Sequence, residues 1–170
     1  MKTVLIPTDY RTESLEYIPQ LLSKFYPEEV EVIMVHMMSV TDCVRELLML
    51  SRRSAEYKHI SDDFYKTCIK LKNDHKDQLK NIRLEFFYGN TTASFRNFIE
   101  LNDIDAVLPL TGYDYKMLNK ASINPIEMID RCGNKLTKLN SLELDKKQFK
   151  AKLEVFKETE QEPILTEEYV

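Results

Sequence analysis

Short apolar runs recur along this chain and alternate with amphipathic stretches. The runs cover residues 4–6, 30–38, 83–88 and 106–110, and the first ends at Pro7. Apolar runs of this length, bounded by turn-forming residues, are typical of strands buried in a parallel sheet. The proline within the last run predicts that this strand ends early. We therefore predict four strands, of which the first two are buried.

The stretches between these runs have helical periodicity. Apolar residues at helical spacing predict a helix over residues 12–25, which Pro19 either kinks or delays. A longer stripe over residues 57–79 repeats in steps of three and four and predicts one long helix of about seven turns. Thr91 or Thr92 can cap the helix that follows the third strand.

The order of the elements defines the fold class and the domains. A further helix is expected to start near Asn124–Pro125, which completes a βαβαβαβα pattern. This pattern predicts an α/β fold with a mostly parallel sheet and helices on both faces. A fifth strand should follow at residues 135–140, but KLTKLN has two lysines and no β-branched run. We expect five strands, or four plus a degenerate fifth, in a domain over residues 1–139. Residues 140–170 are predicted to form an amphipathic helix and an acidic tail.

Composition narrows the class of protein. The 170 residues are 43% hydrophobic and 31% charged, as in a soluble globular chain, and the net charge of −4 gives no reason to expect nucleic acid. No apolar run is long enough to span a membrane, and no signal peptide is expected. Three widely spaced cysteines without a CxxC pair are typical of reduced thiols, which predicts a cytoplasmic location.

The residues after the first run are the strongest candidates for chemistry. In an open α/β sheet, ligands bind beyond the carboxyl ends of the strands, and Pro7, Thr8 and Asp9 lie at such an end. A hydroxyl and a carboxylate there can hold a ribose, a base edge or a metal. The alternative is that Thr8 and Asp9 only cap the following helix.

Four segments carry a resemblance to a known family: VLIPTDY at residues 4–10, VIMVHM at 32–37, FFYGN at 86–90 and IDAVLPLTG at 104–112. In this order and at these separations, over roughly residues 1–135, they resemble the universal stress protein family. The resemblance implies a Rossmann-like three-layer α/β sandwich, usually a homodimer, and many members bind ATP. Carried over, Pro7, Thr8 and Asp9 match the end of the first strand, and the backbone of Met37 matches a position that meets adenine.

The chain departs from the family after the fourth strand. ATP-binding members have a Gly-x2-Gly-x9-Gly-Ser/Thr motif there, because bare backbone amides must approach phosphate oxygens. Here the three glycine positions become Leu110, Tyr113 and Ile123. Gly112 is the nearest glycine and the remaining candidate for a ligand contact, but it lies out of register. Tyr113 would fill space that a triphosphate needs, so ATP binding is expected to be weak or lost.

Other candidate constellations favour structure over chemistry. Met34 and Met38 should face one side of their strand and Met37 the other, so the three do not converge on a metal. His36 lies near the expected cleft and is the first histidine to test. We predict no metal site and no catalytic residue.

These observations lead to three functional hypotheses. The first is a non-catalytic universal stress protein-like domain that acts through protein association or small-ligand sensing in a stress response, as a homodimer or with a protein partner bound through residues 140–170. The second is an adenine-nucleotide binder for AMP, ADP or ATP that uses Thr8, Asp9 and the Met37 backbone. The third is an adenylate-handling enzyme of the wider superfamily.

Overall fold

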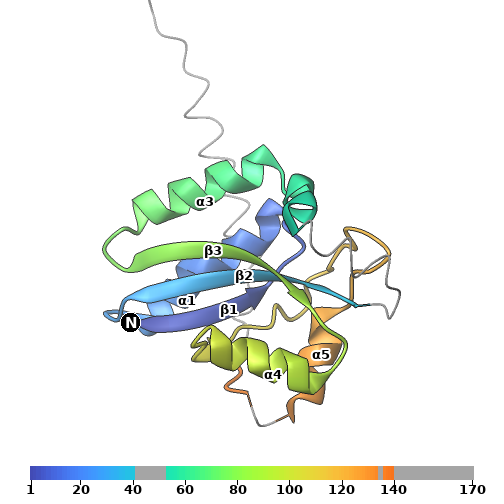
Figure 1. The fold of residues 1–170 in the computed structure, drawn as a ribbon. Helices are drawn as coiled ribbons and strands as arrows, with labels where there is room; N and C mark the ends of the chain where they lie inside the picture. Colours follow the sequence, from blue (N-terminus) through green and yellow to red (C-terminus); the bar gives the residue numbers. More distant parts are fainter. Residues whose placement is uncertain (41–52, 134–135, 140–170) are drawn as a thin grey trace, which may run out of the picture.

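A parallel sheet forms the centre of the protein (Figure 1). The structure is a computed structural model that describes residues 1–40, 53–133 and 136–139. In this part of the chain the strands are β1 (Lys2–Pro7), β2 (Val30–Met38), β3 (Leu79–Tyr88) and β4 (Ala106–Val107), in the order β3-β2-β1-β4. All pairings are parallel, with Lys2 beside Val30 and Val4 beside Ala106. The predicted α/β class with a parallel sheet is confirmed.

Helices cover both faces of the sheet. A 3-10 helix, η1 (Thr12–Tyr17), leads into α1 (Ile18–Phe25), and η2 (Arg53–His59) precedes α3 (Asp62–Asp74). The chain continues through α4 (Thr92–Leu101) and α5 (Pro125–Arg131). In Figure 1, α1 and α3 lie on one side of the sheet and α4 and α5 on the other. The molecule therefore has three layers.

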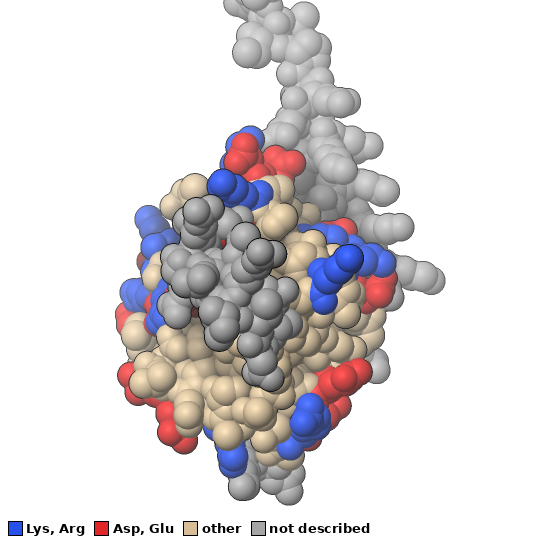
Figure 2. Space-filling model, turned by 45° about the vertical axis from the view of Figure 1, so that its right-hand side comes forward, with Lys and Arg blue, Asp and Glu red and all other residues tan. Residues whose placement is uncertain are grey.

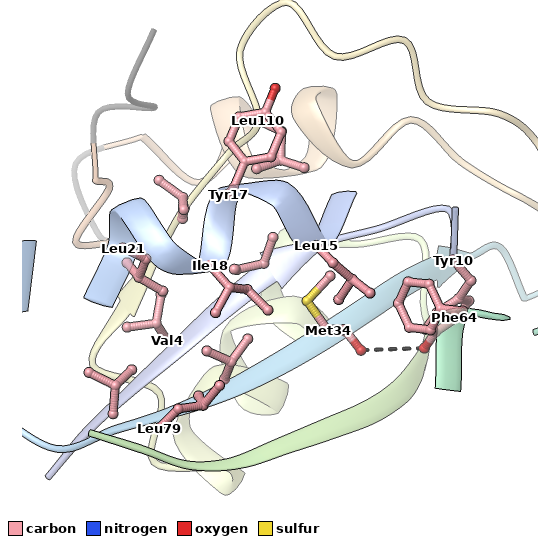
Figure 3. Close-up of a cluster of buried hydrophobic side chains, with 14 of the residues drawn as sticks. Val4, Tyr10, Leu15, Tyr17, Ile18, Leu21, Met34, Phe64, Leu79 and Leu110 are labelled. Atoms are coloured by element: carbon pink, nitrogen blue, oxygen red, sulfur yellow. Dashed lines mark hydrogen bonds between the residues drawn. The ribbon is translucent and has the colours of Figure 1, made fainter. Parts of the chain in front are cut away.

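Two hydrophobic cores follow from the alternation of side chains along β1. Val4 and Ile6 pack into the core beneath α1 and α3, while Leu5 packs into the core on the side of α4 and α5. Figure 3 shows the first of these cores, where Ile18 and Leu21 of α1 lie over Val4. The methionines of β2 divide in the same way, with Met34 and Met38 in the first core and Met37 in the second, as the sequence predicts.

Local signals explain where several helices begin. The α-helical part of the first stretch starts late, at Ile18, with Pro19 in its first turn. The hydroxyl of Thr91 accepts a hydrogen bond from the backbone N–H of Ser94 and caps α4, and the Asn124 side chain caps α5 in the same way.

The prediction of one long helix over residues 57–79 is wrong. Ser61 interrupts it, because its hydroxyl accepts a hydrogen bond from the N–H of Phe64 and starts α3 as a new helix. The apolar spacing continues across the break since Tyr57 of η2, Phe64 of α3 and Leu79 of β3 all contact the same core. A common buried face, and not one helix, produces the stripe.

The last strands are short at the edge of the sheet. β4 ends at Val107, two residues before Pro109, in agreement with the predicted early end. Beyond it, one parallel bridge joins Val107 to Lys138, with hydrogen bonds of 2.8 Å on either side from Val107 N–H to the Thr137 carbonyl and from Leu139 N–H to the Val107 carbonyl. This bridge lies where the degenerate fifth strand is expected. The predicted helix and tail at 140–170 lie outside the described residues.

The opposite edge of the sheet is formed by β3. Polar and charged side chains alternate along it, including Lys80, Arg83 and Glu85. Arg83 is held by Glu85 at 3.3 Å and by the Asn102 side chain at 2.6 Å. None of the helices in the described ranges combines the length and the apolar character that a bilayer crossing requires.

Candidate functional site

The carboxyl ends of β1, β2 and β4 meet below the segment that connects β4 to α5. We call residues 110–123 the cover segment; in Figure 1 it contributes to the yellow-orange loops beyond the arrowheads of the strands. The sheet order changes direction between β1 and β4, which is where ligands bind in open α/β sheets. The structure brings Pro7, Thr8, Asp9 and Met37 to this end, as the sequence predicts, and all four are buried.

Asp9 is held entirely by groups of the protein itself. Its Oδ1 accepts hydrogen bonds from the Tyr113 hydroxyl at 2.7 Å and the Arg11 N–H at 3.2 Å. Its Oδ2 accepts from the Lys116 N–H at 2.9 Å and from Arg11 Nε at 2.8 Å. Two donors on each oxygen take up the usual capacity of a carboxylate. Asp9 therefore has few lone pairs left for a ligand.

The electrostatic state of Asp9 follows from these contacts. Burial by itself opposes the charge and would raise the pKa of this carboxyl. The hydrogen bonds from the Lys116 N–H, Tyr113 and Arg11 outweigh burial and lower the pKa of Asp9 below its ordinary value. Burial, together with the hydrogen bond to the same carboxylate, raises the pKa of the Tyr113 hydroxyl. Asp9 is thus a charged acceptor and Tyr113 a neutral donor at neutral pH.

The aromatic side chains of the cover segment fix its position over Asp9. The guanidinium of Arg11 lies 5.2 Å from the centre of the Tyr113 ring and donates to the Asp114 carbonyl at 2.6 Å. The ring of Tyr113 packs edge-on against Tyr115 at 4.8 Å. The cover segment therefore contacts both the Asp9 carboxylate and Arg11.

Thr8 is also satisfied inside the protein. Its hydroxyl accepts from the Tyr10 N–H at 2.8 Å and lies 2.7 Å from the Ser14 hydroxyl. Since Ser14 donates its own proton to the Arg11 carbonyl, Thr8 is the donor in the Thr8–Ser14 pair. These bonds and the Asp9–Arg11 bond shape the turn before η1. The alternative that Thr8 and Asp9 cap the following helix is not borne out, because the N-cap residue of η1 is Arg11 and no side chain caps this helix. Tyr10 adopts a φ of 58° in this turn, an uncommon conformation for an aromatic residue.

The backbone of Met37 has a partner as well. Its carbonyl accepts from the Ile123 N–H at 3.0 Å, and the neighbouring Ser39 N–H donates to the Ala121 carbonyl at 2.7 Å. Met38 and Ser122 form an antiparallel bridge between these two bonds. The cover segment is therefore joined to the end of β2 like a short strand.

His36 links β1 to the cover segment. Its Nδ1 lies 2.8 Å from the Thr8 carbonyl, which can only accept, so Nδ1 carries the proton. Its Nε2 lies 2.9 Å from the hydroxyl of Ser122. Burial lowers the pKa of His36, and the opposing effects of the Thr8 bond, Asp9 and Glu56 do not compensate. In the neutral ring, Nε2 then accepts a hydrogen bond from the Ser122 hydroxyl.

This Ser–His pair does not have the surroundings of a nucleophile. Ser122 and His36 are both buried, and the serine oxygen also accepts the N–H groups of Leu118 at 3.0 Å and Asn119 at 3.2 Å. A serine oxygen with both lone pairs occupied is not free to attack a carbonyl. The pair holds the cover segment in place.

Gly112 lies apart from these contacts. It has a φ of 74°, is exposed, and sits in the turn where the Tyr113 N–H donates to the Leu110 carbonyl at 3.2 Å. Its role as a ligand contact remains a prediction. In the described part of the chain, no three His, Cys, Asp or Glu side chains are grouped as metal ligands.

The part of the surface seen in Figure 2 carries charges of both signs. Figure 2 shows Lys and Arg side chains next to Asp and Glu side chains around the edge of the visible face. Sequence reasoning placed Tyr113 in the path of a triphosphate but missed its bond to Asp9 and the role of Ser122. Two sequence features point to these contacts. Tyr113 stands at a position where the family motif has a glycine, and Ser122 lies shortly before Pro125, where the last helix is expected to start.

Comparison with known proteins identifies the fold. No protein-family model matches the sequence, and no curated protein sequence matches it either. Among solved structures, the universal stress protein UspA from Lactobacillus plantarum has a TM-score of 0.52 at 12% identity, covering 83% of this chain and 97% of that chain. The hypothetical protein PH0823 has a TM-score of 0.49 at 19% identity, covering 85% and 98%. A universal stress protein family member from Burkholderia pseudomallei has a TM-score of 0.46 at 10% identity, covering 82% and 94%. The chain has the Rossmann-like α/β fold of the UspA structure.

Proposed function

We propose that this chain is a non-catalytic, universal stress protein-like domain whose nucleotide cleft is closed by its own cover segment, so that ATP binding is weak or lost. It acts through protein association or small-ligand sensing in a stress response. One observation supports this proposal above all: the Asp9 carboxylate accepts four hydrogen bonds from Arg11, Tyr113 and Lys116 of the chain itself.

The other candidate ligand contacts support the same conclusion. A nucleotide at this end of the sheet would use Asp9, the Thr8 hydroxyl and the Met37 backbone, and each already has a partner within the protein. A ligand would have to replace these bonds. Its net binding free energy would be only the difference between the bonds it forms and the bonds it displaces. The chain also lacks glycines where backbone amides would contact phosphate, with Leu110, Tyr113 and Ile123 in their place.

Thermal unfolding with millimolar ATP, ADP and AMP tests this proposal. A ligand at one hundred times its dissociation constant adds about 2.7 kcal/mol of stability, which would raise Tm by roughly 5–10 °C in a domain of this size. We expect no shift with any of the three nucleotides, at neutral pH and with Mg²⁺ present.

The Asp9→Ala variant shows how a positive result would be interpreted. A rise in Tm that disappears in Asp9→Ala would favour the second hypothesis, a nucleotide binder using Asp9, and would overturn the proposal. A rise that persists in the variant would also overturn the loss of ATP binding and would place the nucleotide elsewhere.

A further inference from the structure

We propose that His36 and Ser122 form a proton-sensitive latch on the cover segment, which releases when the imidazole takes up a second proton and thereby uncovers Asp9 and the Met37 carbonyl. This inference rests on the proposed function only in that the cover segment closes the cleft. It concerns what opens the cleft, and it requires no ligand.

The first step of the argument is the number of protons around the Ser122 oxygen. That oxygen has two lone pairs and one proton. The N–H groups of Leu118 and Asn119 point to it at 3.0 and 3.2 Å, and its own proton goes to His36 Nε2 at 2.9 Å. All three positions are used, and the arrangement requires Nε2 to be an acceptor.

A second proton on the ring removes that acceptor. Nδ1 still donates to the Thr8 carbonyl at 2.8 Å, so the new proton goes on Nε2. The Nε2–H group of His36 then points at the Ser122 oxygen, which already accepts hydrogen bonds from two N–H groups. The Ser122 hydroxyl has at the same time lost the acceptor to which it donated. At least one of these bonds must break, in a place where the imidazole and Ser122 are both buried. The protonated ring and the closed cover segment are therefore incompatible.

The bonds that loosen are next to those that close the cleft. Ser122 lies directly before Ile123, whose N–H binds the Met37 carbonyl, and directly after Ala121, whose carbonyl binds the Ser39 N–H. Leu118 lies two residues after Lys116, whose N–H binds Asp9 at 2.9 Å. Movement of Ser122 away from His36 would therefore weaken the hydrogen bonds that the cover segment makes to both Met37 and Asp9.

The charged and titratable groups around His36 come from several elements. Asp9 follows β1, and Glu56 lies on η2, where its carboxylate accepts from the Asn119 side chain of the cover segment at 3.3 Å. Tyr10 contributes a ring 6.1 Å from the imidazole, and β3 contributes the uncharged Phe86 ring at 6.0 Å. Both carboxylates favour an imidazolium. Burial disfavours it more strongly, so the closed state keeps the ring neutral.

The direction of the pH response follows from this balance. In the closed state the pKa of His36 lies below its ordinary value, whereas in the open state water restores a value near 6.5. The open state then binds more protons than the closed state, and acid favours opening. With one proton per opening, the open population rises by up to about tenfold for each pH unit below about 6.5, until the closed-state pKa is reached.

Hydrogen–deuterium exchange of the full chain tests the latch. Exchange in peptides from the cover segment and from the strands β1, β2 and β3 is measured between about pH 5 and about pH 7.5, after correction for the intrinsic pH dependence of amide exchange. We expect faster exchange at acid pH in the cover segment, by up to about tenfold per unit, with the strands unchanged. A cover segment without pH dependence would overturn the proposal. A strand response equal to that of the cover segment would overturn it too, because it indicates global unfolding.

Two variants assign the effect to one histidine. His36→Gln should abolish the pH dependence, and His75→Gln, a matched change at the C-cap of α3, should keep it. A His36→Gln variant with the wild-type response would overturn the latch. If His36→Gln does not fold, the wild-type comparison of cover segment and strands still decides. Nucleotides do not enter this assay, so a failed latch is distinguishable from a failed proposed function.

Discussion

Replacing Asp9 with Asn is the sharpest test of the closed site, because the two side chains have the same shape. All four groups that contact Asp9 are donors, from Arg11, Tyr113 and Lys116. An amide has one oxygen, which accepts hydrogen bonds, and one NH₂ group, which donates them. The NH₂ group of the new residue would therefore lie opposite groups that are themselves donors. We expect the amide nitrogen to take the Oδ1 position, since the Tyr113 hydroxyl can rotate to accept there.

The expected cost follows from the bonds that change. The weak bond from the Arg11 N–H, at 3.2 Å, is lost, and the bonds to Lys116 and Tyr113 lose their charge assistance. Hydrogen bonds to charged groups contribute about 1.5–3 kcal/mol each, compared with about 1 for neutral ones. The bond to Arg11 Nε adds less, since that side chain is 37% exposed. We expect Asp9→Asn to lower the free energy of unfolding by about 2–4 kcal/mol at neutral pH.

Urea unfolding followed by circular dichroism at a series of pH values provides the measurement. The folded-state pKa of Asp9 lies below its unfolded value, so its charge stabilises the protein above the unfolded pKa of about 3.9. This stabilisation is lost as the pH falls through the folded pKa. The difference between wild type and Asp9→Asn should therefore be full at neutral pH and shrink below about pH 4.

A matched control lies in the cover segment. Asp114 is exposed and paired with Lys116, and Asp114→Asn should leave the unfolding midpoint close to that of wild type. An Asp9→Asn variant as stable as Asp114→Asn at neutral pH would refute the reasoning. A difference that stays constant down to acid pH would also refute it, because the charge would then play no part.

Three further predictions concern the core, a glycine and the C-terminal segment. Phe64→Ala should cost about 3–5 kcal/mol in urea unfolding, because the ring is fully buried, whereas Ile69→Ala on the exposed side of α3 should cost less than about 0.5. Gly89→Ala should cost about 1–3 kcal/mol in the same assay, since the new Cβ would lie 2.6 Å from the buried ring of Phe87; a neutral result would mean that this ring moves freely. The full chain should have the solution mass of a homodimer, about twice 20.1 kDa, and deleting residues 141–170 should change that state; an unchanged mass by light scattering would count against a role of this segment in assembly.

The strands were the most predictable part of the fold. The run at residues 30–38 coincides with β2, because a fully buried strand needs apolar residues on both faces. The apolar stripe at residues 57–79 led to the wrong prediction of one long helix. Three separate elements contact the same core, and the periodicity of apolar residues does not show the break at Ser61. Capping residues such as Thr91 were readable because their effect is local.

The candidate site was predictable in its strand ends but not in its closure. Thr8 and Asp9 follow from the rule that ligands bind beyond the carboxyl ends of the strands, whereas Met37 was a candidate only through the resemblance to the universal stress protein family. The bonds from Tyr113 and Lys116 to Asp9 span 104 and 107 residues, and no spacing in the sequence signals such a contact. The missing glycines led to the prediction of weak or lost ATP binding, but only the structure shows which groups hold the Asp9 carboxylate.

The position of β3 at the edge of the sheet has a consequence for behaviour at high concentration. Among the described residues β3 pairs with a strand on one side alone, and such an edge is a template for pairing with another chain, which sheet proteins resist with charges along the edge. Lys80, Arg83 and Glu85 supply these charges, with Arg83 anchored to Asn102. Apolar substitutions at these positions would leave the two hydrophobic cores intact, but they would remove the charges from the edge strand and make it a site of aggregation.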